Sequence, residues 1–419
     1  MSKVHFITQG CSANQADSEI MQGILKSEGH ELTESEQDAE LIVFNTCTVK
    51  GPTEAFFKKK LSELEKKNKK VIIAGCIPQA SKNMDALKRH SVIGTYQVDK
   101  IGDVLTETQN GTRVERIERD NHSRLNLPKV RKNPYVEIVP ILQGCLSSCT
   151  FCKTKHARGN AYSYSEEEIV RHISHAVREG AKEVWLTSQD NSVYGLELGS
   201  NLAKLLEKIC TIPRDFKIRV GMGNPKYMLP MLDELIRAFK HEKVYKFLHV
   251  PLQSGSDAVL GAMQRDYTIA EFMNIVEAFR TEIPDITIAT DIICGFPTET
   301  DEDFNATVEF VQGVRPDIIN ISRFWPRPGT PAATMRQIQG AEIKRRTRIL
   351  AELFESIAAE NNRKWLGWKG PVLVQEYGKH GSVLGRNYAY KQVVLSDAHM
   401  GSETLVQIEN VTAYDLRAL

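Results

Sequence analysis

The stretch GCLSSCTFC, residues 144–152, decides how the rest of this chain is interpreted. It places Cys145, Cys149 and Cys152 in a C-x3-C-x2-C arrangement. Three thiolates so close in sequence can bind three irons of a cubane iron–sulfur cluster and leave the fourth iron without a protein ligand. A structural cluster or zinc site is normally closed by a fourth ligand. The stretch therefore predicts a redox centre whose open iron binds another molecule, although zinc with His156 as the fourth ligand stays an alternative on spacing alone.

Composition places the chain among ordinary globular proteins. Of 419 residues, 41% are hydrophobic and 26% are charged, and the length suggests about two to three domains. The formal net charge of +1 gives no global field for nucleic acid, so any RNA contact must come from a local patch. No apolar run approaches the roughly 18 residues of a membrane span, and the N-terminus is predicted as a strand rather than a signal peptide. We expect a cytosolic protein without a membrane contact, whose eight cysteines are metal ligands or buried thiols rather than disulfides.

An α/β fold class is predicted, beginning with an N-terminal domain over residues 1–104. This stretch alternates strand and helix signals, with strands at 3–8, 41–46 and 71–75, which is typical of a small parallel α/β domain. The polar, charged segment 105–134 is interpreted as a linker.

Residues 135–364 continue the alternation and predict six strand–helix units, a partial (β/α)6 barrel. The expected strands are 136–142, 183–187, 216–220, 246–250, 287–293 and 317–321. The three-cysteine stretch follows the first of these strands directly, at the end of the barrel where active sites lie. Residues 365–419 change to short alternating strands with glycine turns, which predict a small β-barrel.

Three further cysteines occupy matching positions in the first domain. Cys11, Cys47 and Cys76 each come just after the carboxyl end of a predicted parallel strand. Because these ends form one ligand-binding edge of an open α/β sheet, the three thiols can converge as a second set with an open iron. Free cysteines are often buried core residues, but three in matched positions favour a second cluster. Cys210 and Cys294 lie outside these motifs and are interpreted as packing thiols.

The central motif, with Phe151 before its last cysteine and a six-unit α/β barrel behind it, resembles the radical S-adenosylmethionine superfamily. In that superfamily the open iron chelates the methionine group of the cofactor, and reduction yields a 5′-deoxyadenosyl radical. The resemblance implies cluster-borne chemistry, and no side-chain acid or base is assigned. Later strand ends are expected to contact the cofactor, although such ends are usually turns or helix caps. The expected cofactor-binding residues are Phe151, Gln189, Asp190, Gln253, Ser254, Ile293 and Gly295.

Over nearly its whole length the chain resembles the methylthiotransferase family. The supporting strings, in order, are QGCSANQADSE, NTCTV, AGC, PLQSGSD, DIICGFPTETDEDF and PRPGTP. The resemblance implies two 4Fe-4S clusters. One, on Cys11, Cys47 and Cys76, carries or delivers sulfur, and the other, on the central motif, binds S-adenosylmethionine. One S-adenosylmethionine methylates that sulfur, and a second supplies the radical that activates the substrate carbon.

Three segments are most similar to the threonylcarbamoyladenosine tRNA group of that family, in its archaeal and eukaryotic branch. They are CKTKHARGN (152–160), EVWLTSQDNSVYG (183–195) and NISRFWPRPGTPAATMRQ (320–337). This group implies a methylthio group at carbon 2 of threonylcarbamoyladenosine next to the anticodon. Siblings that act on isopentenyladenosine in tRNA or on an Asp of a ribosomal protein are alternatives, and a non-catalytic zinc RNA-binding protein is a remote one. The chain ends at YDLRAL without the membrane tail of eukaryotic members, which favours the soluble archaeal form.

The last domain resembles a TRAM module, an RNA-binding β-barrel. Its basic and aromatic side chains can pair phosphates and stack on unpaired bases, although any one of them can equally lie on a solvated face. The candidates are Lys379, His380, Arg386, Tyr388, Tyr390 and Lys391. The expected partners are a tRNA anticodon stem-loop and a low-potential electron donor of the flavodoxin or ferredoxin type.

Overall fold

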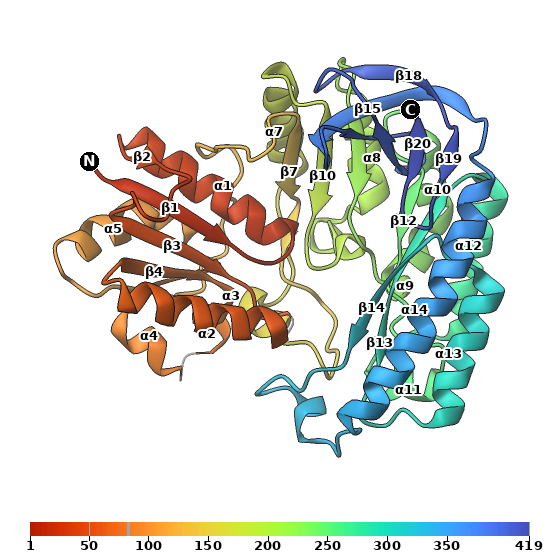
Figure 1. Ribbon diagram of the computed structural model, residues 1–419, viewed down its shortest axis with the longest axis horizontal. Coiled ribbons are helices and arrows are strands. Elements are labelled where there is room, and N and C mark those ends of the chain that lie inside the picture. The colour runs from red at the N-terminus through yellow and green to blue at the C-terminus, as the bar shows by residue number, and fades with distance from the viewer. Residues whose placement is uncertain (50, 82–83, 419) are drawn as a thin grey trace.

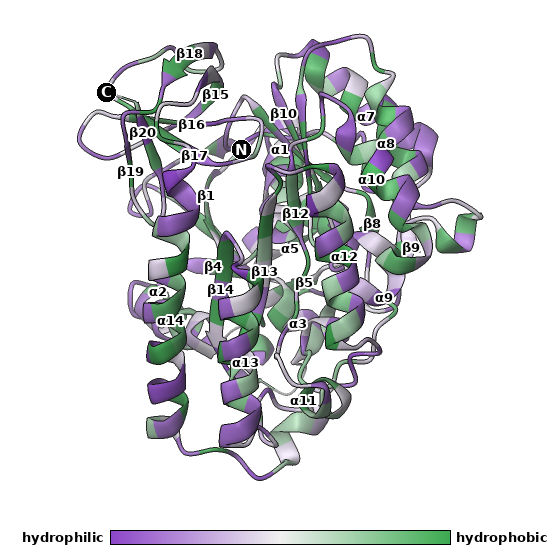
Figure 2. Cartoon of the chain, turned by 90° about the vertical axis from the view of Figure 1, so that its right-hand side faces the viewer, coloured by the Kyte–Doolittle hydropathy of each residue, from purple (hydrophilic) through white to green (hydrophobic). Residues whose placement is uncertain are grey.

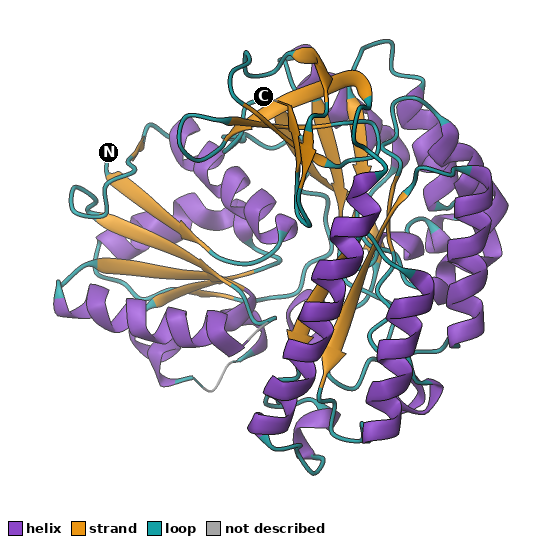
Figure 3. Ribbon diagram, turned by 45° about the vertical axis from the view of Figure 1, so that its right-hand side comes forward, coloured by secondary structure: helices purple, strands orange, loops and turns teal. Residues whose placement is uncertain are grey.

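The computed structural model describes residues 1–49, 51–81 and 84–418, and it confirms an α/β fold. Figure 1 shows an N-terminal α/β layer beside a partial barrel, with a C-terminal sheet over one end of that barrel. Figure 3 shows the same three parts by secondary structure, with helices on both faces of the first sheet. No helix within the described ranges is both long enough and apolar enough to span a bilayer.

The N-terminal sheet is wholly parallel, in the order β2-β1-β3-β4-β5-β6. Its strands are β1 (Lys3–Thr8), β2 (Glu31–Leu32), β3 (Leu41–Thr46), β4 (Lys70–Gly75), β5 (Ser91–Gly94) and β6 (Glu115–Arg116). Its helices are α1 (Ser12–Ser27), α2 (Gly51–Lys66), α3 (Cys76–Ala80), α4 (Asp85–Arg89) and α5 (Ile101–Gln109). The three predicted strands are confirmed as β1, β3 and β4, whereas β2, β5 and β6 are too short to show a pattern in the sequence.

The order of these strands creates a ligand-binding edge. Both faces of β3 are covered, since Val43 packs with α1 and α5 while Phe44 packs with α2. The chain passes from β1 to β2 on one side and then to β3 on the other, so a topological switch point lies between β1 and β3. Loops that follow the carboxyl ends of strands separate at such a point and leave room for a ligand. In Figure 1 these carboxyl ends point toward the barrel.

Residues 105–134, expected to be a linker, are packed into the fold; we call this segment the strap. The predicted boundary after residue 104 falls inside α5, and β6 adds a sixth strand to the sheet. The Lys129 ammonium pairs with Glu19 of α1 (Nζ to Oε2, 3.2 Å) and with Glu137 at the start of the barrel. Composition cannot distinguish a charged free linker from a charged segment that neutralises buried carboxylates, because the sequence does not show which carboxylates become buried.

Six parallel strands confirm the predicted partial barrel. They form two sheets, β11-β10-β7 and β12-β13-β14, and a parallel bridge between Ile218 and Val244 extends the first sheet toward the second. The strands are β7 (Val136–Pro140), β10 (Glu183–Thr187), β11 (Lys217–Val220), β12 (Phe247–His249), β13 (Thr287–Cys294) and β14 (Ile318–Arg323). The main covering helices are α7 (Glu166–Arg178), α8 (Leu202–Cys210), α10 (Leu232–Lys240), α11 (Asp257–Ala262), α12 (Ile269–Glu282), α13 (Asp301–Val314) and α14 (Gly340–Arg363). Figure 2 shows polar and apolar stripes along α13 and α14, as expected for helices with one face on a core.

The N-terminal domain packs against the first strands of the barrel. Ala16 of α1 lies in one apolar cluster with Val136 and Ile138 of β7. At the start of α1, Ser12 Oγ lies 2.5 Å from Thr187 Oγ1, which is the last residue of β10. The ligand-binding edge of the first sheet is therefore held close to the carboxyl ends of the barrel strands.

The C-terminal sheet covers the opposite end of the barrel, where its strands begin (Figure 1). The sheet has the order β18-β15-β16-β17-β20-β19 and is antiparallel except between β17 and β20. Its strands are β15 (Lys369–Tyr377), β16 (Val383–Arg386), β17 (Gln392–Leu395), β18 (Glu403–Gln407), β19 (Asn410–Val411) and β20 (Leu416–Ala418). Tyr390 packs against Tyr245 and Phe247, and Lys391 Nζ lies 2.8 Å from Asp317 Oδ1. The curled sheet is consistent with the expected small barrel.

Substitution of Gly23 tests the packing of the strap. A Cβ at Gly23 would lie 2.2 Å from the backbone nitrogen of Lys129. Gly→Ala inside a helix normally stabilises by about 0.5–1 kcal/mol, but here the strap must move, so we expect Gly23→Ala to lower the free energy of unfolding by about 1–3 kcal/mol. Gly313→Ala in α13 is the matched control, because a Cβ there has nothing within 4 Å. Urea unfolding measures both variants, and an equal gain in stability would show that the strap does not pack on α1.

Candidate functional site

The three cysteines of the N-terminal domain follow neighbouring strands. Cys11 follows β1, Cys47 follows β3 and Cys76 begins α3 directly after β4. The loops that carry Cys11 and Cys47 touch, since a Cβ at Gly10 would lie 3.0 Å from Cys47 Sγ. Burial raises the pKa of the Cys47 thiol, and Cys11 raises it further. Burial also raises the pKa of Cys76 to about 12 against the opposing field of Arg158, with contributions from Cys47 and Cys11. The three sulfurs therefore lie within electrostatic range of one another.

The side chain of Asn14 joins the three loops that carry these cysteines. Its Nδ2 donates to the carbonyl oxygens of Gln9 (3.0 Å) and Thr46 (2.8 Å), which lie just before Cys11 and Cys47. Its Oδ1 accepts from the Cys76 thiol, with 3.5 Å between sulfur and oxygen. Asn14 is fully buried. One amide therefore holds the carboxyl ends of β1, β3 and β4 in register around the cysteines.

The central motif lies on a loop that leaves the barrel after β7. The strand pair β8 (Leu142–Gln143) and β9 (Tyr162–Ser163) closes the base of this loop. Gly144 has a φ of +84°, and a Cβ there would lie 1.9 Å from the carbonyl oxygen of Asn160, so only glycine fits. The Gly144 N–H donates to Gln189 Oε1 (2.7 Å), which joins the loop to the end of β10.

A buried arginine faces the sulfurs of this loop. Burial raises the pKa of the Cys145 thiol to about 11, and Asp190 adds to that effect. Arg265 is buried, and its Nη1 donates to Cys149 Sγ at 3.3 Å. A cationic donor stabilises the thiolate, which is the form of cysteine that binds metal. The sequence analysis did not identify Arg265, because this arginine lies far from the central cysteine motif along the chain.

The predicted cofactor residues nearest the loop brace it. Asp190 Oδ1 accepts from the Ser192 N–H (3.1 Å), the Ser192 hydroxyl (2.5 Å) and the Asn224 N–H (3.1 Å). Burial raises the pKa of the Asp190 carboxyl. Phe151 packs on an apolar cluster that includes Val259 and Phe296. With Gln189, these residues support the loop, and their direct contact with S-adenosylmethionine stays a prediction.

The predicted cofactor residues on later strands share one braced edge. Gln253 has a φ of +78°, an uncommon conformation for glutamine that its surroundings must hold, and its carbonyl accepts from the Ile293 N–H (2.9 Å). Ser254 is buried, with its Oγ 3.5 Å from Thr307 Oγ1. The Gly295 N–H donates to Glu299 Oε2 (2.8 Å). Hydrogen bonds therefore brace this edge, as expected of a preorganised binding site.

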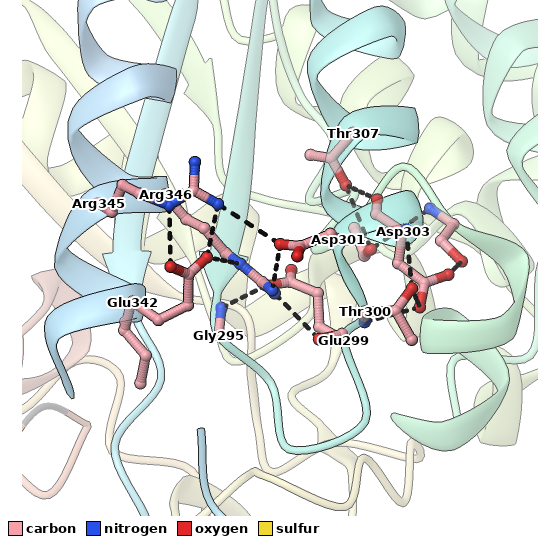
Figure 4. Close-up of polar contacts among 12 residues, drawn as sticks. Gly295, Glu299, Thr300, Asp301, Asp303, Thr307, Glu342, Arg345 and Arg346 are labelled. Carbon is pink, nitrogen blue, oxygen red and sulfur yellow. Dashed lines mark hydrogen bonds and ion pairs between the residues drawn. The ribbon is translucent and has the colours of Figure 1, made fainter. Parts of the chain in front are cut away.

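Figure 4 shows how α14 secures the loop after β13. Arg346 lies among the carboxylates of Glu299, Asp301 and Glu342. Its Nη1 donates to Glu299 Oε2 (2.6 Å) and its Nε donates to Glu342 Oε1 (2.8 Å). A Cβ at Gly295, whose φ is +80°, would lie 2.5 Å from a side-chain carbon of Ile343. The motif that contains Gly295 is thus held by α14 from outside the barrel.

The predicted RNA-binding residues fall into three groups by exposure. Lys379 and His380 are exposed in the turn between β15 and β16, and the neighbouring Tyr377, which the sequence analysis missed, is 79% exposed. Tyr390 and Lys391 instead are buried against the barrel, and Lys391 Nζ is paired with Asp317 and with Asn362 Oδ1 (3.0 Å). The structure therefore gives these two residues a docking role in place of the predicted RNA contact.

The two remaining candidates are half-buried at the same interface. The Arg386 guanidinium lies 4.8 Å from the centre of the Tyr390 ring. The Tyr388 hydroxyl donates to Asp285 Oδ2 (2.8 Å). A contact of either residue with RNA stays a prediction.

The donor sets fit iron–sulfur clusters. Each set offers three thiols, which are the soft ligands that select such clusters, and Arg265 supplies a hydrogen bond to one sulfur. Within the described ranges no three His, Cys, Asp or Glu side chains stand close enough to ligate a single metal ion. Thiolates of a cubane each bind a different iron and so stand farther apart than the ligands of one ion.

Fold and site together define a radical S-adenosylmethionine enzyme with an added three-cysteine domain. A family model described as the radical SAM superfamily matches residues 139–311, and one described as uncharacterized protein family UPF0004 matches residues 3–94. Radical S-adenosylmethionine enzymes use a 4Fe-4S cluster and S-adenosylmethionine, and these are cofactors of this chain. Solved structures of TsrM from Kitasatospora setae (TM-score 0.58, 15% identity, 80% of this chain and 77% of that one) and of OxsB (TM-score 0.54, 13% identity, 87% and 56%) share the fold.

Curated relatives identify the family more narrowly. The probable threonylcarbamoyladenosine tRNA methylthiotransferase of Pyrococcus horikoshii is 40% identical over 99% of this chain and 98% of its own length. The threonylcarbamoyladenosine tRNA methylthiotransferase of Homo sapiens is 42% identical over 97% of this chain and 72% of its own length. The chain belongs to the threonylcarbamoyladenosine tRNA methylthiotransferase family.

Alkylation of the metal-free protein tests the placement of the N-terminal thiols. Cys11 is exposed, whereas Cys76 is buried and its pKa is raised to about 12. The thiolate is the nucleophile, so iodoacetamide should modify Cys11 at least about tenfold faster than Cys76. The rate at Cys76 should rise about tenfold per pH unit between about pH 7 and about pH 9, because that range lies far below its pKa. Mass spectrometry of the peptides measures both rates, and equal rates at the two thiols would contradict the buried position of Cys76.

Proposed function

We propose that this enzyme attaches a methylthio group to carbon 2 of threonylcarbamoyladenosine next to the anticodon of tRNA. The observation that carries the proposal is the full-length similarity to enzymes of that name, at 40% and 42% identity. Two sets of three cysteines on neighbouring domains supply what sulfur insertion at a carbon centre requires. The sibling reactions on isopentenyladenosine or on a ribosomal-protein Asp have no relative among the proteins named above.

Each cysteine set has its own part in the proposed reaction. Cys145, Cys149 and Cys152 hold the cluster that binds S-adenosylmethionine, while Cys11, Cys47 and Cys76 hold a second cluster that presents sulfur. When bound, these cofactors supply the electron, the hydrogen-abstracting radical and the methyl group. The protein orients them: Gly144 and Gln189 fix the central loop, and Asn14 fixes the N-terminal edge. A flavodoxin- or ferredoxin-type donor and a cytosolic location belong to the same proposal.

A cavity between the three domains is a suitable chamber for the target nucleoside. It has a volume of about 760 Å³, within the range of ligand pockets, and is lined by Cys11 and Gln15 of the first domain, Trp185 of the barrel and Gln375 of the C-terminal sheet. The Trp185 indole offers a face for base stacking. A larger cavity of about 990 Å³ lies between the strap and α7, and no cysteine lines it.

Two cysteine substitutions separate the proposed roles. Cys149→Ala should abolish reductive cleavage of S-adenosylmethionine, because the open-iron cluster loses a ligand. Cys47→Ala should leave that cleavage in place and end methylthio insertion. The measurement is anaerobic reaction of reconstituted protein with reductant and threonylcarbamoyladenosine-containing tRNA, followed by mass spectrometry of nucleosides and of 5′-deoxyadenosine. Methylthio product from Cys47→Ala would refute the role of the second cluster, and product only on isopentenyladenosine would reassign the substrate.

The exposed turn of the C-terminal sheet should bind the tRNA. Lys379→Ala should weaken tRNA binding about threefold to tenfold and reduce its dependence on salt, because one phosphate contact is lost. Tyr377→Ala should weaken binding by a similar factor through loss of stacking. Arg348→Ala on α14, which is 71% exposed, is the matched control. Fluorescence anisotropy at two salt concentrations measures these effects. If both turn variants bind tRNA with the same affinity as the parent, this turn is not the RNA-binding surface.

A further inference from the structure

A buried arginine from the barrel enters the N-terminal cysteine site. Helix α6 (Thr154–Arg158) begins two residues after Cys152 and ends at Arg158, whose side chain is 3% exposed. The Arg158 Nη2 donates to Asp17 Oδ2 (2.6 Å) and to Asn14 Oδ1 (2.8 Å), both on α1. Asn14 Oδ1 is the same atom that accepts from the Cys76 thiol. The arginine that follows one cysteine set thus shares a hydrogen-bond acceptor with Cys76 of the other set.

Backbone contacts fix α6 in this position. Thr95 Oγ1 donates to the carbonyl oxygen of Ala157 (2.7 Å), and the Tyr96 hydroxyl donates to that of Arg158 (2.6 Å). Both donors follow β5 of the N-terminal sheet. The last turn of α6 is therefore clamped to the first domain, and Arg158 has no freedom to swing toward solvent.

The charges around Arg158 leave an excess of positive charge at the site. Asp17 receives Arg158 on Oδ2 and Arg124 on Oδ1 (3.3 Å), so two guanidinium groups share one carboxylate. All three residues are buried. Burial lowers the pKa of Arg158, but Asp17, Cys76 and Cys11 outweigh that effect and raise it. The arginine remains charged, and its field acts on Cys47 and Cys76 in the direction that favours thiolate.

A second barrel arginine reaches the same cysteines from the other side. Arg327, in the loop after β14, is buried and its Nη2 donates to Thr48 Oγ1 (3.0 Å) and Glu54 Oε2 (2.8 Å). Thr48 is the residue after Cys47, and the Arg327 charge favours the Cys47 thiolate. Glu54 is shared between Arg327 and Lys58 (Nζ to Oε1, 3.1 Å), but Lys58 is exposed and solvent screens its charge, whereas Asp17 is shared between two buried arginines, Arg158 and Arg124. Arg158 is therefore the stronger source of uncompensated charge.

We propose that Arg158 is a positioning residue through which the barrel completes the N-terminal cluster site and raises the reduction potential of the cluster held by Cys11, Cys47 and Cys76. The inference rests on the proposed function, which assigns a cluster to those cysteines. A cubane on three thiolates is an anion, and reduction adds another negative charge. Nearby buried positive charge favours the reduced form, because the protein interior screens it weakly.

The test isolates the N-terminal cluster in the full-length chain. In a Cys145→Ala/Cys149→Ala/Cys152→Ala background, protein reconstituted anaerobically with iron and sulfide should bind about four irons per chain. Redox titration followed by electron paramagnetic resonance then gives the midpoint potential for the parent, Arg158→Met and Arg158→Lys. Arg119→Met is the matched control, since Arg119 is exposed and contacts the same helix through the His156 carbonyl (2.8 Å).

Arg158→Met should shift the midpoint potential to a more negative value, Arg158→Lys should restore most of the difference, and Arg119→Met should leave the potential unchanged. An unchanged potential in Arg158→Met overturns the inference. If Arg158→Met binds no iron, the Arg158→Lys variant distinguishes the two possibilities. A cluster in Arg158→Lys with a midpoint potential near that of the parent supports a role for the positive charge. Failure of Arg158→Lys to bind iron shows that the site needs the shape of the arginine side chain, which overturns the inference. Absence of iron from the parent would instead remove the second cluster from the proposed function.

Discussion

The buried interaction of Asp17 with Arg158 is the constraint on which the arrangement of this enzyme depends. Two charges removed from water are costly unless each is fully hydrogen-bonded, and here Arg124 and Asn14 complete the set. Loss of one partner from such a group typically costs about 3–5 kcal/mol, because the other charge is left buried. The interaction therefore locks the helix that follows the central motif onto the helix that follows Cys11, and two domains with separate cores acquire one relative position.

The relative position of the two domains brings together two sheet edges, each of which carries a set of cysteines. In both parallel sheets the cysteine loops follow the carboxyl ends of strands, where backbones diverge and a ligand has room. The C-terminal sheet sits where the barrel strands begin, so Tyr390 and Lys391 close the far end of the barrel. Its exposed turn at Tyr377 and Lys379 stays free for a partner. The cavity lined by Cys11, Trp185 and Gln375 lies between the C-terminal sheet and the N-terminal domain and reaches the edge that carries Cys11.

Much of the fold follows from local patterns. The strands of the first domain that carry cysteines and the six barrel strands are short apolar runs bounded by polar or glycine residues, and the structure contains all of them. The strap was misjudged because its charge resembled that of a free linker, although Lys129 neutralises buried carboxylates on both sides. Lys391 was misjudged for a related reason: a lysine in a basic, aromatic stretch suggests RNA, yet its ammonium is buried beside Asp317. In both cases the partner of the charge lies far away along the chain.

The sequence by itself determined that the cysteines of both sets follow strand ends, because motif spacing and strand periodicity are local properties of the chain. It also determined the family, through strings spread over nearly its whole length. Only the tertiary structure decided which cations surround the sulfurs. Arg265 meets Cys149, and Arg158 meets Asn14 and Asp17, across more than 100 residues of chain. The effect of a charge depends on burial and distance, and both arise only when the domains pack.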